Sequence, residues 1–241
     1  MFYWPVVPIC EAQQLDVAAE DLILMGTYRR CKTYKAGGGY DQFPTIFRKR
    51  WPGEWEGLEE QFVVQLKGCT LECPYCYVTK TGVNGMPTRI QTNEMVRTFE
   101  WSKCGVFHLM GGAPAIYIEH WPELLECLDG RPFHSDFILN EKPYDVNVLR
   151  QIAEYPNQLH AVSIKGEDAL AYQYKTHTAV DFPMMMDNLE KLVNCGVPFY
   201  VTFTGMSELA IEEFKNSVGK DIFEDSFAIE VRDYDALHWD D

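Results

Sequence analysis

Three cysteines, Cys69, Cys73 and Cys76, lie at C-x3-C-x2-C spacing directly after the apolar run Phe62–Leu66. Thiolates are soft ligands that hold iron–sulfur clusters or zinc, and this spacing lets one short loop surround a single centre. Three protein ligands on a cubane cluster leave the fourth iron open to a substrate or cosubstrate. The stretch therefore predicts a metal centre with one open coordination position.

Two other interpretations of these cysteines fit the sequence less well. A structural zinc site needs a fourth ligand nearby, but the next cysteine, Cys104, falls in another expected element, and the nearest downstream histidine is His108. A disulfide framework is not expected in a chain of 241 residues in which we expect no secretory signal. The remaining cysteines have no partners at ligand spacing and are expected to be free buried thiols: Cys10, Cys31, Cys104, Cys127 and Cys195. Ligation of a second cluster by Cys10 and Cys31 is the alternative, which no compact motif supports.

The cysteine motif resembles the signature of the radical S-adenosylmethionine (SAM) superfamily, C-x3-C-x-aromatic-C, with Tyr75 in the aromatic place. The resemblance implies that Cys69, Cys73 and Cys76 hold a [4Fe-4S] cluster and that SAM chelates its fourth iron. In that family one electron from the cluster cleaves SAM to methionine and a 5′-deoxyadenosyl radical, which abstracts a hydrogen atom from the substrate. The cofactor carries out the difficult chemistry, and the protein positions the cofactor against the substrate and excludes competing reactions.

A second motif, Gly111-Gly112-Ala113-Pro114, follows the expected strand Val106–Met110. Two glycines let the backbone approach a ligand closely and adopt dihedral angles that other residues avoid. The segment resembles the family's Gly-Gly-Glu-Pro segment, whose backbone groups bind the amino end of SAM, and the resemblance implies the same role here. This chain has Ala113 where the family commonly has Glu, so a side-chain contribution from that position is lost.

Polar residues also follow or end the next two expected strands. Asn140 lies where relatives often show Thr-Asn-Gly, and its amide can donate and accept hydrogen bonds toward SAM or the substrate. Ser163 and Lys165 alternate onto one face of a strand, in a place similar to that where activating enzymes of glycyl-radical proteins carry Asp-x-Lys against SAM. The resemblance implies that Lys165 meets the SAM carboxylate. The histidines show no ligand spacing, and His108 is expected to be a structural residue within its strand.

From residue 61 onward, expected strands and helices alternate regularly. The strand candidates are Gln61–Lys67, Val106–Met110, Asp136–Leu139, Ala161–Lys165, Val197–Thr204 and Phe227–Val231. The helix candidates are Thr92–Ser102, Ile118–Leu128, Val146–Tyr155, Phe182–Asn194 and Ser207–Ser217. This alternation predicts an α/β fold with a mostly parallel sheet and helices outside. Six strands favour an open, partial (β/α)6 barrel, in which chemistry lies at the C-terminal strand ends, and the cysteine loop follows the first strand accordingly.

The hydrophobic content of 46% is enough for one sizeable core and fits a single α/β domain. Residues 61–232 are expected to form the partial barrel. Residues 1–60 are expected to be an N-terminal extension that packs on the barrel, and residues 233–241 an acidic C-terminal tail.

The chain carries 21 basic and 36 acidic residues, a formal net charge of −15. A strongly acidic surface repels phosphates, so a polynucleotide substrate is disfavoured, whereas a small nucleotide in a locally basic pocket is not. No apolar run approaches the ~20 residues of a membrane helix. Together with the cysteine usage, this predicts a protein of the reducing cytoplasm.

The motifs indicate a reaction class without naming a substrate. The compact size resembles that of glycyl-radical activating enzymes and of small-molecule enzymes such as 7-carboxy-7-deazaguanine synthase, and a peptide-modifying role is a third alternative. An enzyme of this class needs a reductant such as flavodoxin or ferredoxin. From a different class, a non-catalytic iron–sulfur or zinc-binding module would carry the same cysteines. Production of methionine on reduction with SAM separates that module from all the enzymatic alternatives.

Overall fold

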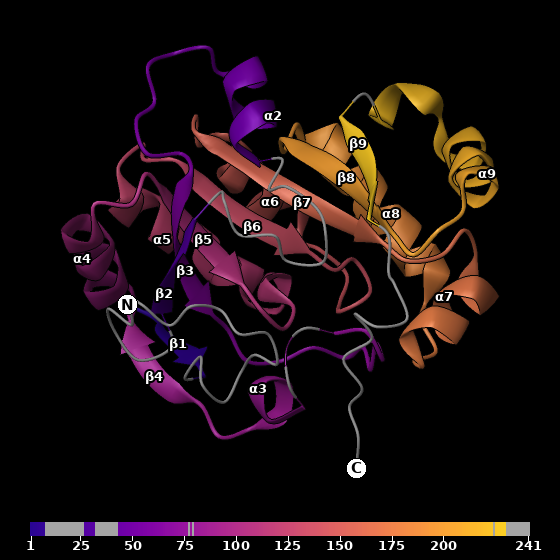
Figure 1. Ribbon diagram of the computed structural model, residues 1–241, viewed down its shortest axis with the longest axis horizontal. Helices are drawn as coiled ribbons and strands as arrows, with labels where there is room; N and C mark the ends of the chain where they lie inside the picture. The colour runs from indigo at the N-terminus through magenta and orange to yellow at the C-terminus, as the bar shows by residue number, and fades with distance from the viewer. Residues whose placement is uncertain (8–26, 32–42, 77, 79, 224, 230–241) are drawn as a thin grey trace.

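A computed structural model describes residues 1–7, 27–31, 43–76, 78, 80–223 and 225–229. In this part of the chain, a seven-stranded sheet has the order β2-β3-β5-β6-β7-β8-β9. Its strands are β2 (Thr27–Cys31), β3 (Glu60–Gln65), β5 (Val106–Met110), β6 (Phe133–Phe137), β7 (Gln158–Ile164), β8 (Phe199–Thr204) and β9 (Ser226–Ile229). Strand β2 is antiparallel to β3, and every later neighbour pair is parallel. The expected α/β partial barrel with six parallel strands is therefore confirmed (Figure 1).

The third parallel strand lies earlier than the sequence predicts. We expected Asp136–Leu139, but β6 spans Phe133–Phe137, and Leu139 lies in the turn that follows. Ile138 and Leu139 are nevertheless buried. These two residues are apolar because they are buried after the strand ends, and not because they pair in the sheet. The apolar run therefore placed the predicted strand too late in the sequence.

The expected helices are all present, with small shifts at their ends. They are α4 (Thr92–Ser102), α5 (Trp121–Leu128) preceded by the 3-10 segment η1 (Pro114–His120), α6 (Val146–Ala153), α8 (Phe182–Cys195) and α9 (Glu208–Val218). Several short elements carry no clear pattern in the sequence and were not predicted: β1 (Tyr3–Val6), α2 (Phe43–Arg50), α3 (Lys80–Asn84), β4 (Thr88–Gln91), α7 (Ala169–Thr176) and η2 (Lys220–Phe223).

Helix α8 shows how the local sequence sets an element's limits. The Asp181 side chain accepts a hydrogen bond from the backbone N–H of Met184 and so satisfies one free donor at the helix start. Pro183 stands in the first turn, where its missing N–H costs nothing. Gly196 ends the helix with φ of 72°, a left-handed conformation that glycine adopts without a steric penalty.

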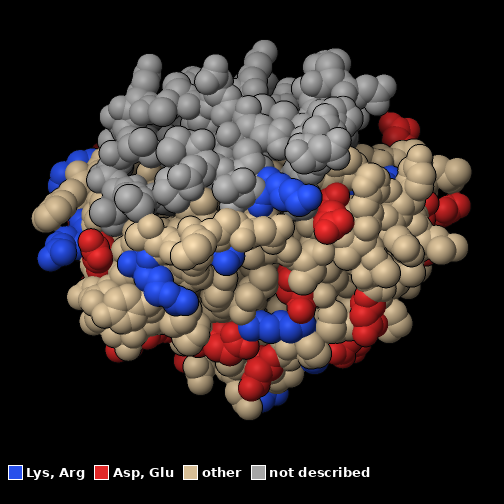
Figure 2. All heavy atoms as spheres, turned by 90° about the horizontal axis from the view of Figure 1, so that it is seen from below, with Lys and Arg blue, Asp and Glu red and all other residues tan. Residues whose placement is uncertain are grey.

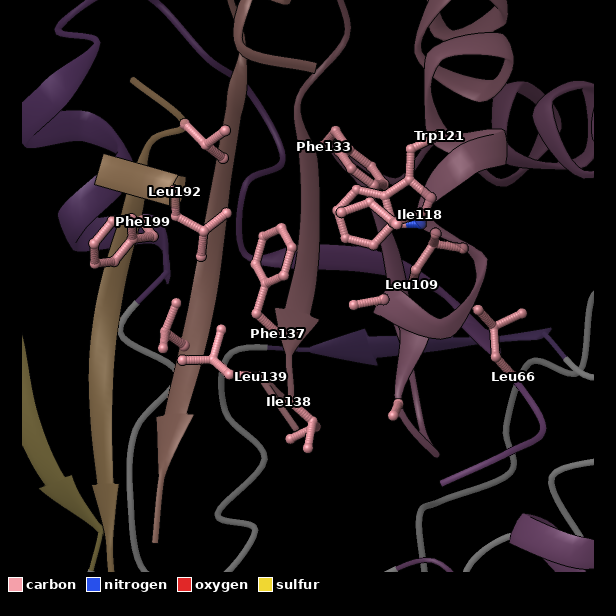
Figure 3. Close-up of a cluster of buried hydrophobic side chains, with 14 of the residues drawn as sticks. Leu66, Leu109, Ile118, Trp121, Phe133, Phe137, Ile138, Leu139, Leu192 and Phe199 are labelled. Atoms are coloured by element: carbon pink, nitrogen blue, oxygen red, sulfur yellow. The ribbon is translucent and has the colours of Figure 1, made fainter. Parts of the chain in front are cut away.

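The main hydrophobic core lies between the sheet and the helices on its outer face. Figure 3 shows Trp121 of α5 beside Phe133 and Phe137 of β6, and the ring centroid of Trp121 lies 5.5 Å and 5.2 Å from those two rings. All three side chains are fully buried. Burial of large aromatic side chains contributes much of the stability of such a core.

A second, smaller hydrophobic cluster covers the opposite, inner face of the sheet. Phe43, Ile46 and Phe47 of α2 pack there against residues near the N-terminal ends of the strands, including Leu159 and Tyr200. Figure 1 places α2 beside the ends at which the central strands begin. Helix α2 therefore closes the N-terminal end of the inner face.

The first residues of the chain are built into the same structure. Strand β1 pairs antiparallel with β4, and the fully buried Trp4 donates from Nε1 to Oγ1 of Thr92 at 3.1 Å. Residues 8–26 and 32–42 of the expected extension, and the whole expected tail 233–241, lie outside the described residues.

Charged side chains of both signs are interspersed over the face of the molecule shown in Figure 2, apart from the area covered by grey atoms. The basic run that ends α2 follows this pattern: Lys49 and Arg50 pair with Asp225, and Arg48 pairs with Glu59. Within the described ranges, no helix is long and apolar enough to cross a membrane.

Replacement of Phe137 by Ala tests the main core. Phe137 is fully buried, with ring contacts to Trp121, Tyr144 and His160. The substitution should lower the free energy of unfolding by about 3–5 kcal/mol because it removes the transfer energy of the ring and leaves a cavity. Denaturant unfolding followed by circular dichroism measures the change.

The matched control is Tyr174→Ala, since Tyr174 on α7 is 82% exposed. This substitution should change the free energy of unfolding by no more than about 0.5 kcal/mol. Equal effects of the two substitutions would contradict the assignment of Phe137 to the core.

Candidate functional site

The cysteine loop begins where β3 ends, and it touches the segments that follow several other strands. After β5, the Ala113 N–H donates to the Gly68 carbonyl oxygen at 2.6 Å. After β6, the Asn140 side-chain amide donates to Oγ1 of Thr70 at 3.0 Å. At the end of α7, which follows β7, the Thr176 carbonyl accepts from the N–H of Glu72 at 3.1 Å. The loop therefore lies across the C-terminal ends of the parallel strands.

The three cysteines of this loop are free thiols. Cys73 is buried, Cys69 and Cys76 are partly buried, and the Cys76 N–H donates to the Cys73 carbonyl oxygen at 3.0 Å, which tightens the loop. Burial raises the pKa of Cys69, and the nearby carboxylate of Glu141 raises it further. Burial also raises the pKa of Cys76 to about 11, although a backbone hydrogen bond from Val78 and the charge of Lys165 act in the opposite direction. A bound cation would offset this cost by stabilising the thiolates, which are the form that binds metal.

Lys165 follows β7 directly and supplies positive charge beside the cysteines. Its Nζ donates to Oγ of Ser163 at 3.0 Å and lies 5.6 Å from the centre of the Tyr75 ring. Burial lowers the pKa of Lys165, but the negative charges that Cys73, Tyr172 and the other two cysteines carry when ionised raise it by more, so the net pKa is raised. Lys165 therefore stays protonated at neutral pH. The structure brings three of the expected site residues, Tyr75, Ser163 and Lys165, into one group.

The two glycines after β5 are required by contacts within the protein. Gly111 and Gly112 have φ of 73° and 55°, in the left-handed region. A Cβ built on Gly112 would lie 2.3 Å from the Gly68 carbonyl oxygen, and one on Gly111 would lie 1.5 Å from Nε2 of Gln65. We expected these residues to approach a ligand. The structure adds that they already approach the loop that carries Cys69.

Ala113 and Pro114 complete the expected motif. Ala113 is fully buried and packs in the main core, and Pro114 begins η1, where it needs no N–H donor. The place held by a carboxylate in relatives is thus occupied by a small apolar side chain.

Asn140 lies against the loop, together with a residue that the sequence analysis missed. The carboxylate of Glu141 accepts a hydrogen bond from the Thr70 N–H at 3.1 Å. Burial raises the pKa of Glu141, and the hydrogen bonds from Thr70 counteract part of that shift. Glu141 has no motif of its own, and only the fold brings it to Thr70, so the sequence offered no signal for it.

The residues present at this site fit the two cofactors that the motif implies. Three free thiols share one loop, a protonated lysine lies beside them, and loop backbone from two strand ends borders them. Among the described residues, the buried Oδ1 of Asn140 and the buried hydroxyl of Tyr172 have no hydrogen-bond partner in the protein. Buried polar atoms of this kind usually have a partner, so a bound polar molecule is expected here.

Comparisons with known proteins agree with this site. The family model of the radical SAM superfamily matches residues 63–219, which is more than half of the chain. No curated protein matches the chain.

Several solved structures share the fold. The protein anSMEcpe with bound AdoMet is 18% identical with a TM-score of 0.54, over 69% of this chain and 48% of that chain. SuiB of Streptococcus suis bound to S-adenosylmethionine is 12% identical with a TM-score of 0.55, over 78% and 42%. HydG, a maturase of the [FeFe]-hydrogenase, is 10% identical with a TM-score of 0.50, over 68% and 41%. The chain spans less than half the length of each, and the likeness concerns the fold alone.

The family match includes the cysteine loop, the glycine motif and the strand ends that surround them. The chain therefore belongs to the radical SAM superfamily, whose cofactors are a [4Fe-4S] cluster and S-adenosyl-L-methionine.

Proposed function

We propose that Cys69, Cys73 and Cys76 hold the [4Fe-4S] cluster and that the enzyme acts by reductive cleavage of SAM. The cluster and SAM, when bound, supply methionine and a 5′-deoxyadenosyl radical that abstracts hydrogen from the substrate. The observation that carries the proposal is the position of the cysteine loop across the C-terminal strand ends, where it is hydrogen-bonded to the segments that follow β5 and β6 and to the last residue of α7. In folds of this kind that end of the sheet forms the active site.

The protein's part in this reaction is to fix the loop and to balance its charge. Glu141 and Asn140 hold Thr70, the residue after the first cysteine, by its backbone N–H and its hydroxyl. Lys165 provides a cation that attracts either the thiolates or the carboxylate of SAM. Backbone groups of the segment from Gly111 to Pro114 bind the amino end of SAM, and the free Oδ1 of Asn140 accepts a further hydrogen bond from SAM or the substrate.

The proposed substrate is a glycyl-radical protein, a small nucleotide-like molecule or a peptide, and the proposed electron donor is a flavodoxin or ferredoxin. The net charge of −15 argues against a polynucleotide. The product of a reaction with each candidate distinguishes the three classes: a glycyl radical on a partner protein, a modified purine-like ring, or a mass change on a peptide.

Anaerobic reconstitution tests the cluster ligands. The wild-type protein should hold about four irons per chain, and the variant Cys69→Ala/Cys73→Ala/Cys76→Ala should hold none, because no other thiols share the loop. Iron and sulfide analysis together with absorption spectra measure the difference.

The matched controls for this experiment are Cys104→Ala and Cys195→Ala. Neither cysteine forms a disulfide and both lie outside the loop, so both variants should retain the full iron content. Full iron retention in the triple variant would refute the ligand assignment.

Lys165→Ala tests the charge beside the cluster. The reduced wild-type enzyme with SAM and no substrate should slowly yield 5′-deoxyadenosine and methionine. The variant should keep its iron but bind SAM more weakly, since a charge-assisted hydrogen bond contributes roughly 1.5–3 kcal/mol, or about 10- to 150-fold in Kd. Equilibrium binding of SAM and chromatography of the products provide the two measurements.

Lys191→Ala is the control, because Lys191 pairs with Asp187 on α8, away from the loop. Its SAM affinity should equal that of the wild type.

Absence of 5′-deoxyadenosine from cluster-replete, reduced enzyme would favour a non-catalytic module. Formation of methylthioadenosine would show that another bond of SAM breaks. We include this outcome because Ala113 stands where the family commonly has Glu.

A further inference from the structure

Two histidines and an aspartate form a compact group on the inner face of the sheet. One ring nitrogen each of His108 and His134 and one carboxylate oxygen of Asp136 all lie within 4.8 Å of one another. The two histidines are buried and Asp136 is partly buried. Neither the cluster ligands nor the expected SAM contacts include these residues.

Strand register brings the group together. His108 of β5 pairs with His134 of β6 in the parallel ladder, and their ring centroids are 4.2 Å apart. Asp136 follows two residues later on β6, so it lies on the same face as His134, one step nearer to the C-terminal end of the strand. The sequence separation of 26 and 28 residues from His108 hid this arrangement, because it matches no compact ligand motif.

Each imidazole is also held by a protein oxygen through its other ring nitrogen. Nδ1 of His108 lies 2.5 Å from Oε1 of Gln61, and Nε2 of His134 lies 2.9 Å from the hydroxyl of Tyr200. A ring nitrogen that donates to such an oxygen leaves its partner nitrogen with a lone pair, and metal-binding histidines are typically fixed in this way. A metal ion would therefore meet Nε2 of His108 and Nδ1 of His134, both of which are shielded from solvent.

The surroundings close the group on one side. The Phe43 ring of α2 lies 4.4 Å from the His134 ring, and α2 covers the N-terminal ends of the strands. Asp136 stands on the other side, toward the end of the sheet where the cysteine loop lies. A metal ion here would have the two imidazoles on the side of α2 and the Asp136 carboxylate on the side of the strand ends.

We propose that His108, His134 and Asp136 bind a divalent transition metal ion, with zinc as the default occupant. Two imidazoles and one carboxylate are a ligand set that zinc and related ions favour, and three protein ligands leave a position for water or an oxygen atom of the substrate. The proposal goes beyond the radical SAM reaction and does not depend on it, because metal binding at this group requires neither the cluster nor SAM.

The test uses the full chain with Cys69, Cys73 and Cys76 replaced by Ala, so that added metal cannot bind to the cysteine loop. Titration with Co²⁺, followed by its visible absorption, should show one bound ion per chain, and Zn²⁺ should displace it. Asp136→Asn and His134→Asn in this background should each weaken Co²⁺ binding at least 10-fold. Tyr200→Phe should weaken it by about 10- to 100-fold, because the hydroxyl positions the ring of His134.

Two histidine variants serve as matched controls. His160 is also buried, but it packs against Trp121 on the outer face, and His177 is exposed at the end of α7. His160→Asn and His177→Asn should leave the Co²⁺ affinity unchanged. Near-UV circular dichroism shows whether each variant is folded, and Asp136→Asn and Tyr200→Phe decide the outcome if His134→Asn is not.

Metal analysis of the cluster-reconstituted wild-type enzyme provides an independent measurement. After incubation with zinc and desalting, it should contain about one zinc per chain in addition to its iron, and the Asp136→Asn enzyme should contain iron alone. Folded protein that binds no Co²⁺, or binding that survives both ligand substitutions, would overturn the proposal and leave the two histidines a structural role.

Discussion

The close approach of two backbone segments is the constraint on which the rest of the site depends. Gly112 lies so near to Gly68 that any side chain at position 112 would overlap the Gly68 carbonyl oxygen, and the Ala113 N–H donates to that same oxygen. This contact joins the loop after β3 to the turn after β5. The loop with its three thiols is consequently held at the end of the sheet by backbone, before any cofactor contributes.

The sheet separates two kinds of environment. Its outer face packs large aromatic side chains such as Trp121 and Phe137 against the helices and provides most of the buried apolar surface. Its inner face carries polar residues, among them Gln61, His108 and Thr202, which are buried although they contribute little to hydrophobic stability. Such residues cost desolvation energy unless they are paired. A stable outer core offsets that cost and lets the inner face keep chemically useful groups.

Local patterns predicted what depends on local sequence. The β-α alternation gave six parallel strands, and the cysteine spacing located the loop at a strand end, because both signals lie within a few neighbouring residues. Long-range contacts were invisible: β1 pairs with β4 across more than 80 residues, and Glu141 reaches Thr70 across 71. The same limit applies to the histidines. His108 looked like a structural residue until the register of β5 and β6 placed His134 beside it.

Helix α2 gives the molecule a property that an open barrel lacks. Phe43 and Phe47 are fully buried against the starts of the strands, so within the described residues one end of the inner face is closed. Among the described residues, a molecule bound on the inner face would thus have the apolar side chains of α2 on one side and the cysteine loop on the other.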